Sequence, residues 1–373
     1  MAERTIRITL ASPAVNAWSE TFIAAHIERL QKVDLLVSGG NPPRHASRGA
    51  QFARSSTVGV WMDRAIARFH GGIPELLRHR LARRLAQERP DVVLAEYGNM
   101  AAEIVASCER AGVPLVVHFH GFDAHRDDYI ARYDGYREVF RYARFVVVVS
   151  RAMEEQLLAI GAPREKVVYN CYGIDVDQFV PGDPSIVEPR FLAVGRFAEK
   201  KAPQLTIRAF RKVLDERPDA RLTMVGQGAL WETCKSLVDE LGLADAVELI
   251  GVRTPKEIAA LFHQCRAFVQ HSVVTSTNDH EGTPLAVLEA MASGVPVIST
   301  RHAGIIDVVK EEERGLLCAE HDVDAMAANM VRFVDDPDLA LRMGVAGRAY
   351  VEKHHRVEVQ VAELQRLLET AAR

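Results

Sequence analysis

The stretch EGTPLAVLEAMASGVP at residues 281–296 decides the fold of this chain. Its pattern predicts a helix that begins at the Thr-Pro step and ends before Gly294, followed by a strand, because proline suits the first turn of a helix and glycine its end. Glu281 lies before this helix and Glu289 lies two turns inside it. A helix N-terminus attracts phosphate, and carboxylates accept hydrogen bonds from hydroxyl groups. The stretch therefore predicts a site for a sugar joined to phosphate.

Short β-branched runs alternate with longer helical patterns along the chain, which predicts parallel sheets built from βαβ units. The strands expected in the first half are Ile6–Leu10, Val33–Val37, Val92–Ala95, Leu115–His118, Phe145–Val149 and Val167–Tyr169. Those expected in the second half are Phe191–Val194, Arg221–Val225, Val247–Ile250, Ala267–Gln270 and Val295–Ser299. The fold class is therefore α/β, with two sheets.

A segment rich in proline separates the two halves. Residues 180–189 contain three prolines and a glycine, as expected of a linker between domains. We therefore expect domains at 1–182 and 183–355. Apolar residues recur at helical spacing after Val357, so residues 356–373 are expected to form a closing helix that needs a surface to cover.

Composition excludes several classes of protein. The 373 residues are 48% hydrophobic and carry a formal charge of −4, and no apolar run reaches the roughly 18 residues of a membrane span. The first ten residues lead directly into a strand pattern without a signal peptide, so we expect the protein in the cytoplasm. The five cysteines are dispersed and predict neither a disulfide framework nor a zinc site.

Ligands of open parallel sheets bind beyond the carboxyl ends of strands, so the loops there are candidate sites. Arg196 follows the strand ending at Val194, and Lys200 and Lys201 come shortly after it. Two cations beside a glycine turn suit a diphosphate, because they stabilise the charge that grows as it leaves. The competing interpretation is a solvated basic loop, in which Lys200 is the lysine expected at the surface.

A second loop, at residues 225–228, reads Val-Gly-Gln-Gly after a predicted strand. It invites a dinucleotide interpretation and an NAD-dependent oxidoreductase. The third glycine of that fingerprint is missing, and the loop lies in the second half rather than at the first βα turn. The oxidoreductase hypothesis is therefore disfavoured.

Six pieces of the chain, taken in order and spacing, resemble the retaining glycosyltransferases of family 4, especially bacterial exopolysaccharide- and lipopolysaccharide-type hexosyltransferases. The pieces are Ser19-Glu20-Thr21-Phe22-Ile23, His118-Phe119-His120-Gly121-Phe122-Asp123, Tyr172-Gly173-Ile174-Asp175, Val194-Gly195-Arg196-Phe197 with Lys200-Lys201, Val225-Gly226-Gln227-Gly228 and residues 281–296. The resemblance implies the GT-B fold: an acceptor-binding and a nucleotide-sugar-binding Rossmann-like domain that face a cleft, with the closing helix crossing back to the first.

The resemblance also implies roles for single residues. Arg196 and Lys201 match the pair that stabilises the leaving group, Glu281 the carboxylate that orients the transferred sugar, and His120 the histidine at its anomeric region. The implied donor contacts are Glu289 at the ribose, Gly282, Thr283, Pro284 and Leu285 at the phosphates, Gly226 in the turn and Val252 at the base. Ser19, Glu20 and Asp123 are the implied acceptor or phosphate contacts. Many relatives carry an aromatic residue and a glycine where this chain has Thr283-Pro284, and proline has no N–H to offer a phosphate.

The predicted reaction is transfer of a hexose from a nucleoside-diphosphate sugar, commonly a UDP-sugar in this family, to a hydroxyl group with retention. The acceptor is a glycan, a lipid-linked sugar or a small molecule. Neither a metal nor a cofactor is expected. Asp175-Val176-Asp177 matches the Asp-x-Asp pattern of a metal-binding motif, but it belongs to the turn beside the linker. Two alternatives stay open, a nucleotide-sugar epimerase of similar fold and a non-catalytic sugar-nucleotide binder.

The region Arg44–Arg89 carries ten arginines and three acidic residues. Apolar residues, among them Trp61 and Phe69, recur within it at near-helical spacing. Such a segment can rest on an anionic membrane at the inner face and reach a lipid-linked acceptor, or it can be an ordinary amphipathic helix packed in the first domain. Nucleic acid is not an expected partner, since no binding motif accompanies the arginines.

Overall fold

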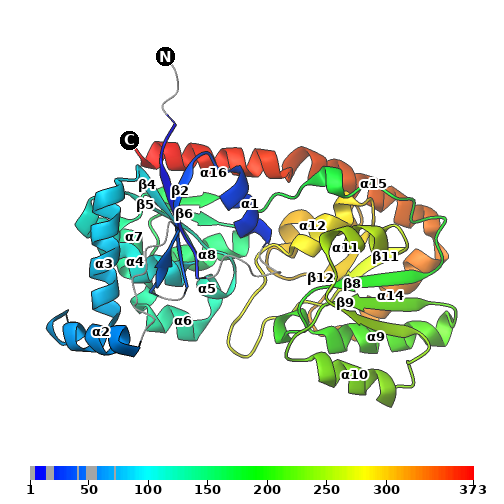
Figure 1. The fold of residues 1–373 in the computed structure, drawn as a ribbon. Coiled ribbons are helices and arrows are strands. Elements are labelled where there is room, and N and C mark those ends of the chain that lie inside the picture. The colour runs from blue at the N-terminus through cyan, green and yellow to red at the C-terminus, as the bar shows by residue number, and fades with distance from the viewer. Residues whose placement is uncertain (1–4, 14–20, 40–41, 48–56, 71–72) are drawn as a thin grey trace. The chain divides into compact units, whose positions relative to one another are not determined.

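The computed structural model describes residues 5–13, 21–39, 42–47, 57–70 and 73–373 of the chain. It divides into two compact units. Unit 1 runs to Asn170 and includes Gln360–Arg373, and unit 2 is Cys171–Val359. Both are α/β units with helices packed on a central sheet; in Figure 1 unit 1 runs from blue to green, with its C-terminal part in red, and unit 2 runs from green to orange.

The sheet of unit 1 has the order β3-β2-β1-β4-β5-β6-β7 in its described part. Its strands are β1 Ile8–Ala11, β2 Val33–Ser38, β3 His45–Ala46, β4 Val92–Glu96, β5 Leu115–His118, β6 Phe145–Val148 and β7 Val167–Tyr169. All pairs are parallel except β2 with β3. The order reverses between β1 and β4, and ligands of such sheets bind at this kind of switch point.

Helices surround this sheet in unit 1. They are α1 Thr21–Arg29, α2 Thr57–His70, α3 Ile73–Glu88, α4 Gly98–Ala111, α5 Phe122–His125, α6 Asp127–Arg132, α7 Arg137–Tyr142 and α8 Arg151–Ala159. The last helix of the chain, α16 Val357–Ala371, joins them from Gln360 onward. Its Gln365 side chain accepts a hydrogen bond from the N–H of Gln31 (3.1 Å). No helix in the described part of the chain is long and apolar enough to span a bilayer.

The sheet of unit 2 repeats the topology, with the order β10-β9-β8-β11-β12-β13 among the described residues. Its strands are β8 Arg190–Val194, β9 Arg221–Val225, β10 Val247–Gly251, β11 Ala267–Gln270, β12 Val297–Thr300 and β13 Gly315–Cys318. Its helices are α9 Pro203–Glu216, α10 Trp231–Glu240, α11 Pro255–Phe262, α12 Leu285–Ala292, α13 Ile305–Val308, α14 Val323–Asp335 and α15 Pro337–His354. Every pair of strands is parallel, and the switch lies between β8 and β11.

The central strands explain why the sequence forms these sheets. All residues of β4, β5, β11 and β12 are buried, because helices cover both faces of a parallel sheet. In unit 2 the core includes Phe191 and Phe210, whose rings meet edge to face. Burial of such side chains supplies the main driving force for folding.

The predicted α/β class and the two Rossmann-like sheets are confirmed, with small differences at strand ends. β12 begins at Val297 rather than Val295, because the N–H of Val295 instead bonds the carbonyl of Ala290 and ends α12. Two strands were not predicted. Two residues, 45–46, are too few to show the alternating pattern of a strand. Residues 315–318 read Gly-Leu-Leu-Cys, which lacks the β-branched residues typical of strands.

The division into units differs from the boundary predicted after Gly182. Residues just after Asn170 already belong to unit 2. Arg348 donates to the carbonyls of Val176 and Phe179, and the N–H of Ile174 bonds the carbonyl of His355 (2.8 Å). These bonds tie the segment before the prolines to the last helices of unit 2, which composition alone does not reveal.

Candidate active site

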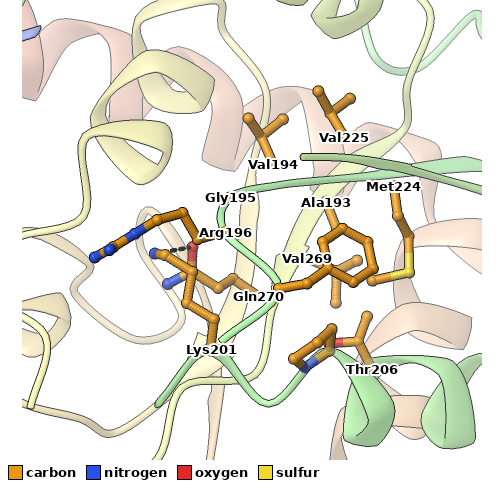
Figure 2. A pocket seen from close by; sticks show the side chains of 12 residues that line it. Ala193, Val194, Gly195, Arg196, Lys201, Thr206, Met224, Val225, Val269 and Gln270 are labelled. Atoms are coloured by element: carbon orange, nitrogen blue, oxygen red, sulfur yellow. Dashed lines mark hydrogen bonds between the residues drawn. The ribbon is translucent and has the colours of Figure 1, made fainter. Parts of the chain in front are cut away.

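Two loops of unit 2 meet beyond the carboxyl ends of β8 and β11. Residues 195–202 follow β8, and residues 271–284 follow β11. Lys201 on the first loop joins Glu281 on the second, with its Nζ 3.1 Å from Glu281 Oε1 and 3.3 Å from Gln270 Oε1. Figure 2 shows Lys201 reaching Gln270 in this way. The predicted leaving-group lysine and the predicted sugar-orienting glutamate are thus direct partners.

Burial and the neighbouring charges shift the pKa values of this ion pair. Burial alone would raise the pKa of Glu281, but Lys201 and Lys200 outweigh it and lower this pKa to about 2. For Lys201 the balance is reversed, since burial lowers its pKa more than Glu281 raises it. The carboxylate is therefore firmly ionised, and the ammonium depends on it, because an unpaired charge in such a place is costly.

Lys200 differs from the expectation that it is a surface residue. It is buried, with Nζ 3.0 Å from Asp279 Oδ1 and 3.2 Å from the carbonyl of His280. It therefore links the loop after β8 to the loop after β11, parallel to the Lys201–Glu281 pair.

His302 and Glu320 hold the backbone of the catalytic candidate Glu281. The N–H of Glu281 donates to His302 Nε2 (3.1 Å), and Nδ1 of the same ring lies 2.6 Å from Glu320 Oε1. Because Nε2 accepts, the proton is on Nδ1 and is donated to Glu320. The other Glu320 oxygen accepts from the N–H of Val274 (2.8 Å). These hydrogen bonds hold the loop after β11 against His302 and Glu320.

Arg196 lies at the mouth of a pocket lined by Gly195, Lys201 and Gln270 on its polar side and by Met224 and other apolar residues. Its side chain is exposed, and no ion pair with it is formed among the described residues. In Figure 2, Arg196 and Lys201 extend to the same side, away from the apolar lining. The two cationic side chains thus lie on one side of this pocket.

The glycine turn beside Arg196 is set by close packing. A Cβ on Gly226, whose φ is +132°, would lie 1.9 Å from the carbonyl oxygen of Gly195. The N–H of Gly226 in turn bonds the carbonyl of Gly251 (2.8 Å), the residue before Val252. The loops after β8, β9 and β10 are thus joined at one edge, and the implied base contact Val252, which is exposed, lies on the third.

The N-terminus of α12 is built as predicted in position but differently in detail. Pro284 is its N-cap, and no side chain caps it, so the free amides are those of Leu285 and Ala286, since the N–H of Val287 bonds the carbonyl of Pro284 (3.1 Å). Gly282 and Thr283 are buried, and the carbonyl of Gly282 accepts from the N–H of Gly304 (3.1 Å). A Cβ on Gly304 would approach that oxygen to 2.2 Å.

Glu289 lies within α12 and is partly buried. Burial raises its pKa to about 7, although Lys201 acts in the opposite direction. Its carboxylate has no hydrogen bond or ion pair among the described residues, so it is available to accept bonds from a ligand.

In unit 1 the corresponding site centres on a carboxylate that the sequence did not single out. Glu96, the last residue of β4, is fully buried. Its Oε2 lies 2.8 Å from Nε2 of His120 and its Oε1 lies 2.8 Å from Nδ1 of His26 on α1. Burial would raise the pKa of Glu96, but His26 and His120 outweigh it and hold this pKa well below its usual range. The carboxylate is therefore ionised between two imidazole N–H groups.

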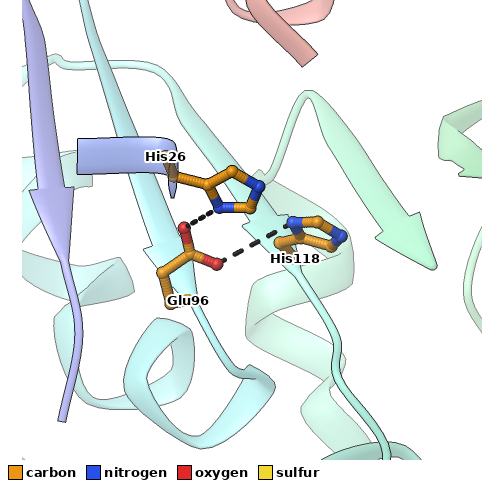
Figure 3. Close-up of side chains that lie close together, drawn as sticks. All are labelled: His26, Glu96 and His118. Atoms are coloured by element: carbon orange, nitrogen blue, oxygen red, sulfur yellow. Dashed lines mark hydrogen bonds and ion pairs between the residues drawn. The ribbon is translucent and has the colours of Figure 1, made fainter. Parts of the chain in front are cut away.

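His118 completes this cluster. Its ring stacks on His26 with centroids 5.4 Å apart, and burial together with the neighbouring His120 holds its pKa well below the usual value. Among the described residues, His26, Glu96 and His118 are the group with metal-ligand character, with donor atoms within 4.8 Å of one another (Figure 3). The 2.8 Å distances to Glu96 are those of hydrogen bonds, which satisfy the carboxylate without a metal.

Asp123, one of the implied acceptor or phosphate contacts, bonds backbone groups of its own unit. It is fully buried, and its carboxylate accepts from the N–H groups of Gly98 (2.8 Å), His120 (3.0 Å) and Gly121 (2.9 Å). Burial raises its pKa while these bonds and His120 lower it. Asp123 therefore holds the loop that carries His120. Ser19 and Glu20 lie outside the described residues.

Four residues of the two sites were missed from the sequence: His26, Glu96, His302 and Glu320. Glu96 carried a usable signal, since it ends the apolar run Val-Val-Leu-Ala at the sheet edge where ligands bind. The other three lie on separate elements, and no spacing connects them to their partners.

The comparisons with known proteins agree with this geometry. The model of the glycosyl transferases group 1 matches residues 185–350, and that of the glycosyl transferase 4-like domain matches residues 21–173. The putative colanic acid biosynthesis glycosyltransferase WcaL of Escherichia coli K12 is 28% identical over 95% of this chain and 88% of its own length. The amylovoran biosynthesis glycosyltransferase AmsK of Erwinia amylovora is 30% identical over 69% of this chain and 64% of its own length.

Among solved structures, HepE of Anabaena in complex with UDP has a TM-score of 0.77 and 15% identity, and the match covers 98% of this chain and 100% of that one. At this identity the likeness shows the fold. The two Rossmann-like units define the GT-B fold. This chain belongs to the glycosyltransferases of the family 4 type.

Proposed function

We propose that the chain transfers a hexose from a UDP-sugar to a hydroxyl group of a glycan, lipid-linked or small-molecule acceptor, with retention at the anomeric carbon and without a metal or cofactor. The observation that carries the proposal is the buried Lys201–Glu281 pair beside a pocket whose mouth holds the exposed Arg196. The HepE structures in complex with UDP and with UDP-glucose support the choice of donor.

In this mechanism Lys201 and Arg196 stabilise the negative charge that develops on the diphosphate as the glycosidic bond breaks. Lys201 is held in place before the reaction by Glu281 and Gln270, so no reorganisation is needed as charge develops. The backbone amides of Leu285 and Ala286 add hydrogen-bond donors for the phosphates.

Glu281 and Glu289 recognise the neutral parts of the donor. Glu281, ionised and fixed through its own N–H by His302, accepts hydrogen bonds from hydroxyl groups of the sugar. Glu289 accepts from the ribose, and a bound donor that offers two hydroxyl protons favours its ionised form. From unit 1 we assign His120 to the reacting sugar, with Glu96 keeping the proton on Nε2.

The acceptor and place of action are part of the same proposal. WcaL and AmsK are named for the biosynthesis of extracellular polysaccharides, which supports a saccharide acceptor. We assign the chain to the cytoplasm with peripheral contact at the inner face of an anionic membrane through the region Arg44–Arg89, where a lipid-linked acceptor is within reach.

The experiment is calorimetric titration of the purified chain with UDP-glucose and with GDP-, ADP- and dTDP-sugars, each in excess chelator. We expect one UDP-sugar to bind, and Arg196→Ala to weaken binding about tenfold to a hundredfold, because a charge-assisted bond to phosphate is lost. Arg211→Ala is the matched control, since Arg211 pairs with Asp215 on the exposed side of α9.

Product analysis completes the test. With the donor identified, the anomeric configuration of the product is read by NMR, and retention is expected. Inversion, strict dependence on added divalent ion, or equal loss of binding in the Arg196 and Arg211 variants would each overturn the proposal as stated. Release of an epimerised sugar without an acceptor would identify an epimerase instead.

A further inference from the structure

Helix α2 of unit 1 has a buried inner face and an exposed apolar outer face. On the inner face, the buried residues Gly59, Asp63 and Ala67 pack toward the rest of the unit. On the outer face, Val58, Trp61 and Phe69 are 70%, 72% and 90% exposed. In an α-helix these outer positions, spaced by three and eight residues, form one stripe.

This concentration is particular to α2. Of the twelve large hydrophobic residues that are exposed in the described part of the chain, five lie on this one helix, and the two aromatic ones among the twelve are Trp61 and Phe69. The others, such as Ile186 and Val345, occur singly. Scattered exposed residues are ordinary, whereas a contiguous apolar stripe indicates a surface that binds something.

The charges beside the stripe indicate what it binds. Arg64 and Arg68 are exposed on the flank of α2, and neither forms an ion pair among the described residues. The acidic residue of the helix, Asp63, is buried and bonded by Arg80 (2.7 Å). The outer side of α2 therefore presents apolar and cationic groups without an exposed carboxylate.

The arginines of the neighbouring helix α3 add less positive charge to the surface than their number suggests, because several of them are paired. On α3, Arg78 pairs with Glu103 (2.8 Å) and Arg84 with Glu88 (2.6 Å), as Arg80 does with Asp63. These pairs are internal to unit 1 and neutralise the charge. Three of the ten arginines of the region are thus paired within unit 1, whereas Arg64 and Arg68 are exposed on α2.

We propose that the outer face of α2, led by Trp61 and Phe69, inserts into the interface of an anionic lipid membrane, with Arg64 and Arg68 contacting lipid headgroups. An apolar stripe flanked by arginines matches an interfacial helix, in which buried area supplies most of the affinity and the cations select anionic lipid. In Figure 1, α2 lies beside the N-terminal end of α3 within unit 1. The inference deepens the proposed function by naming the surface that meets the membrane.

The test is flotation of the full chain with vesicles of phosphatidylcholine alone or mixed with phosphatidylglycerol, at low salt. The wild type is expected to float with the mixed vesicles. Trp61→Ser/Phe69→Ser is expected to weaken partitioning at least about tenfold through lost apolar burial. Arg64→Ala/Arg68→Ala is expected to weaken it about fivefold or more and to reduce its dependence on salt.

The control is Ile186→Ser, which removes an 81% exposed apolar side chain from unit 2 and is expected to leave flotation unchanged. The altered residues are exposed, and circular dichroism checks that each variant is folded. A blue shift of tryptophan emission on adding mixed vesicles, lost in Trp61→Phe, would place Trp61 in the interface.

Three results would overturn the proposal: a wild type that stays in the soluble fraction with both vesicles, flotation of Trp61→Ser/Phe69→Ser equal to wild type, or a dimer in solution that this double variant dissociates. The last would show that the face binds a second copy of the chain. No sugar donor or acceptor enters the assay, so its failure leaves the transferase proposal untouched, and failure of the donor titration leaves this one untouched.

Discussion

The two units place a buried carboxylate at the same point of the same topology, and they neutralise it differently. In unit 1, Glu96 at the end of β4 bonds two imidazoles, those of His26 and His120. In unit 2, Glu281 in the loop after β11 pairs with the ammonium group of Lys201. The switch point of each sheet thus holds one anion and its partners.

The two carboxylates differ in how burial acts on their partners. In unit 2, burial lowers the pKa of Lys201 more than Glu281 raises it, so the charge of this lysine depends on the ionised Glu281. The unit 1 cluster responds to pH, since both Glu96 and His118 have pKa values held below their usual ranges.

The largest effect on the comparison of the two units is expected for Lys201→Ala. It leaves Glu281 buried without its cation and removes a cation from the proposed leaving-group site. We expect a loss of about 10²–10³ in kcat and about 3–5 kcal/mol in the free energy of unfolding. Urea titration and initial rates measure both.

Lys212→Ala is the control for that variant, since Lys212 pairs with Asp324 at the surface and should be nearly neutral in both measurements. Equal effects of the two lysine variants would mean that the Lys201–Glu281 pair has no special role.

A second change, Glu96→Gln, tests unit 1. The amide keeps one acceptor oxygen but presents an NH₂ group to one of the two imidazole donors, so we expect a loss of about 2–4 kcal/mol in the free energy of unfolding at neutral pH. The pKa of Glu96 is depressed, so its stabilisation is present above the ordinary value of 4.5 and is lost as pH falls below it. The difference between wild type and variant should therefore shrink in acid.

Urea unfolding at several pH values measures that difference. His118 adds a second acid effect common to both proteins, because its depressed pKa makes stability fall as pH drops below 6.5. Glu109→Gln, at an exposed pair with Arg141, is the control and should change little. A difference independent of pH would argue that Glu96 is not ionised.

The smallest effect is expected for Glu289→Gln. The pKa of Glu289 is raised to about 7, so ionisation of this group disfavours the fold and stability is lost as pH rises from 4.5 to about 7. The amide variant should be more stable than wild type by about 2 kcal/mol at pH 8 and equal to it near pH 4. It should also bind the UDP-sugar more weakly, because a hydrogen-bond acceptor for the ribose is lost.

Unfolding and calorimetry on the same protein samples measure the two effects of this variant. A variant that is less stable than wild type at pH 8 would contradict the raised pKa. Unchanged donor affinity would remove Glu289 from the donor site.

Much of the site in unit 2 was predictable because its signals are local. Arg196 and Lys201 follow a strand within a few residues, and the stretch at 281–296 contains a whole loop, helix and strand start. The resemblance added the roles of these residues. The burial of Lys200 was not predictable, because its partner Asp279 lies 79 positions away.

The sequence by itself determined the α/β class, most strands and the positions of the candidate donor residues, because hydrophobic periodicity and turn residues act over short distances. Only the tertiary structure decided that Glu96 bonds His26 and His120, that His302 fixes Glu281, that Asp123 clamps its own loop, and that one face of α2 is uncovered. The physical reason is that pairing and burial depend on which distant elements the folded sheet brings to one edge.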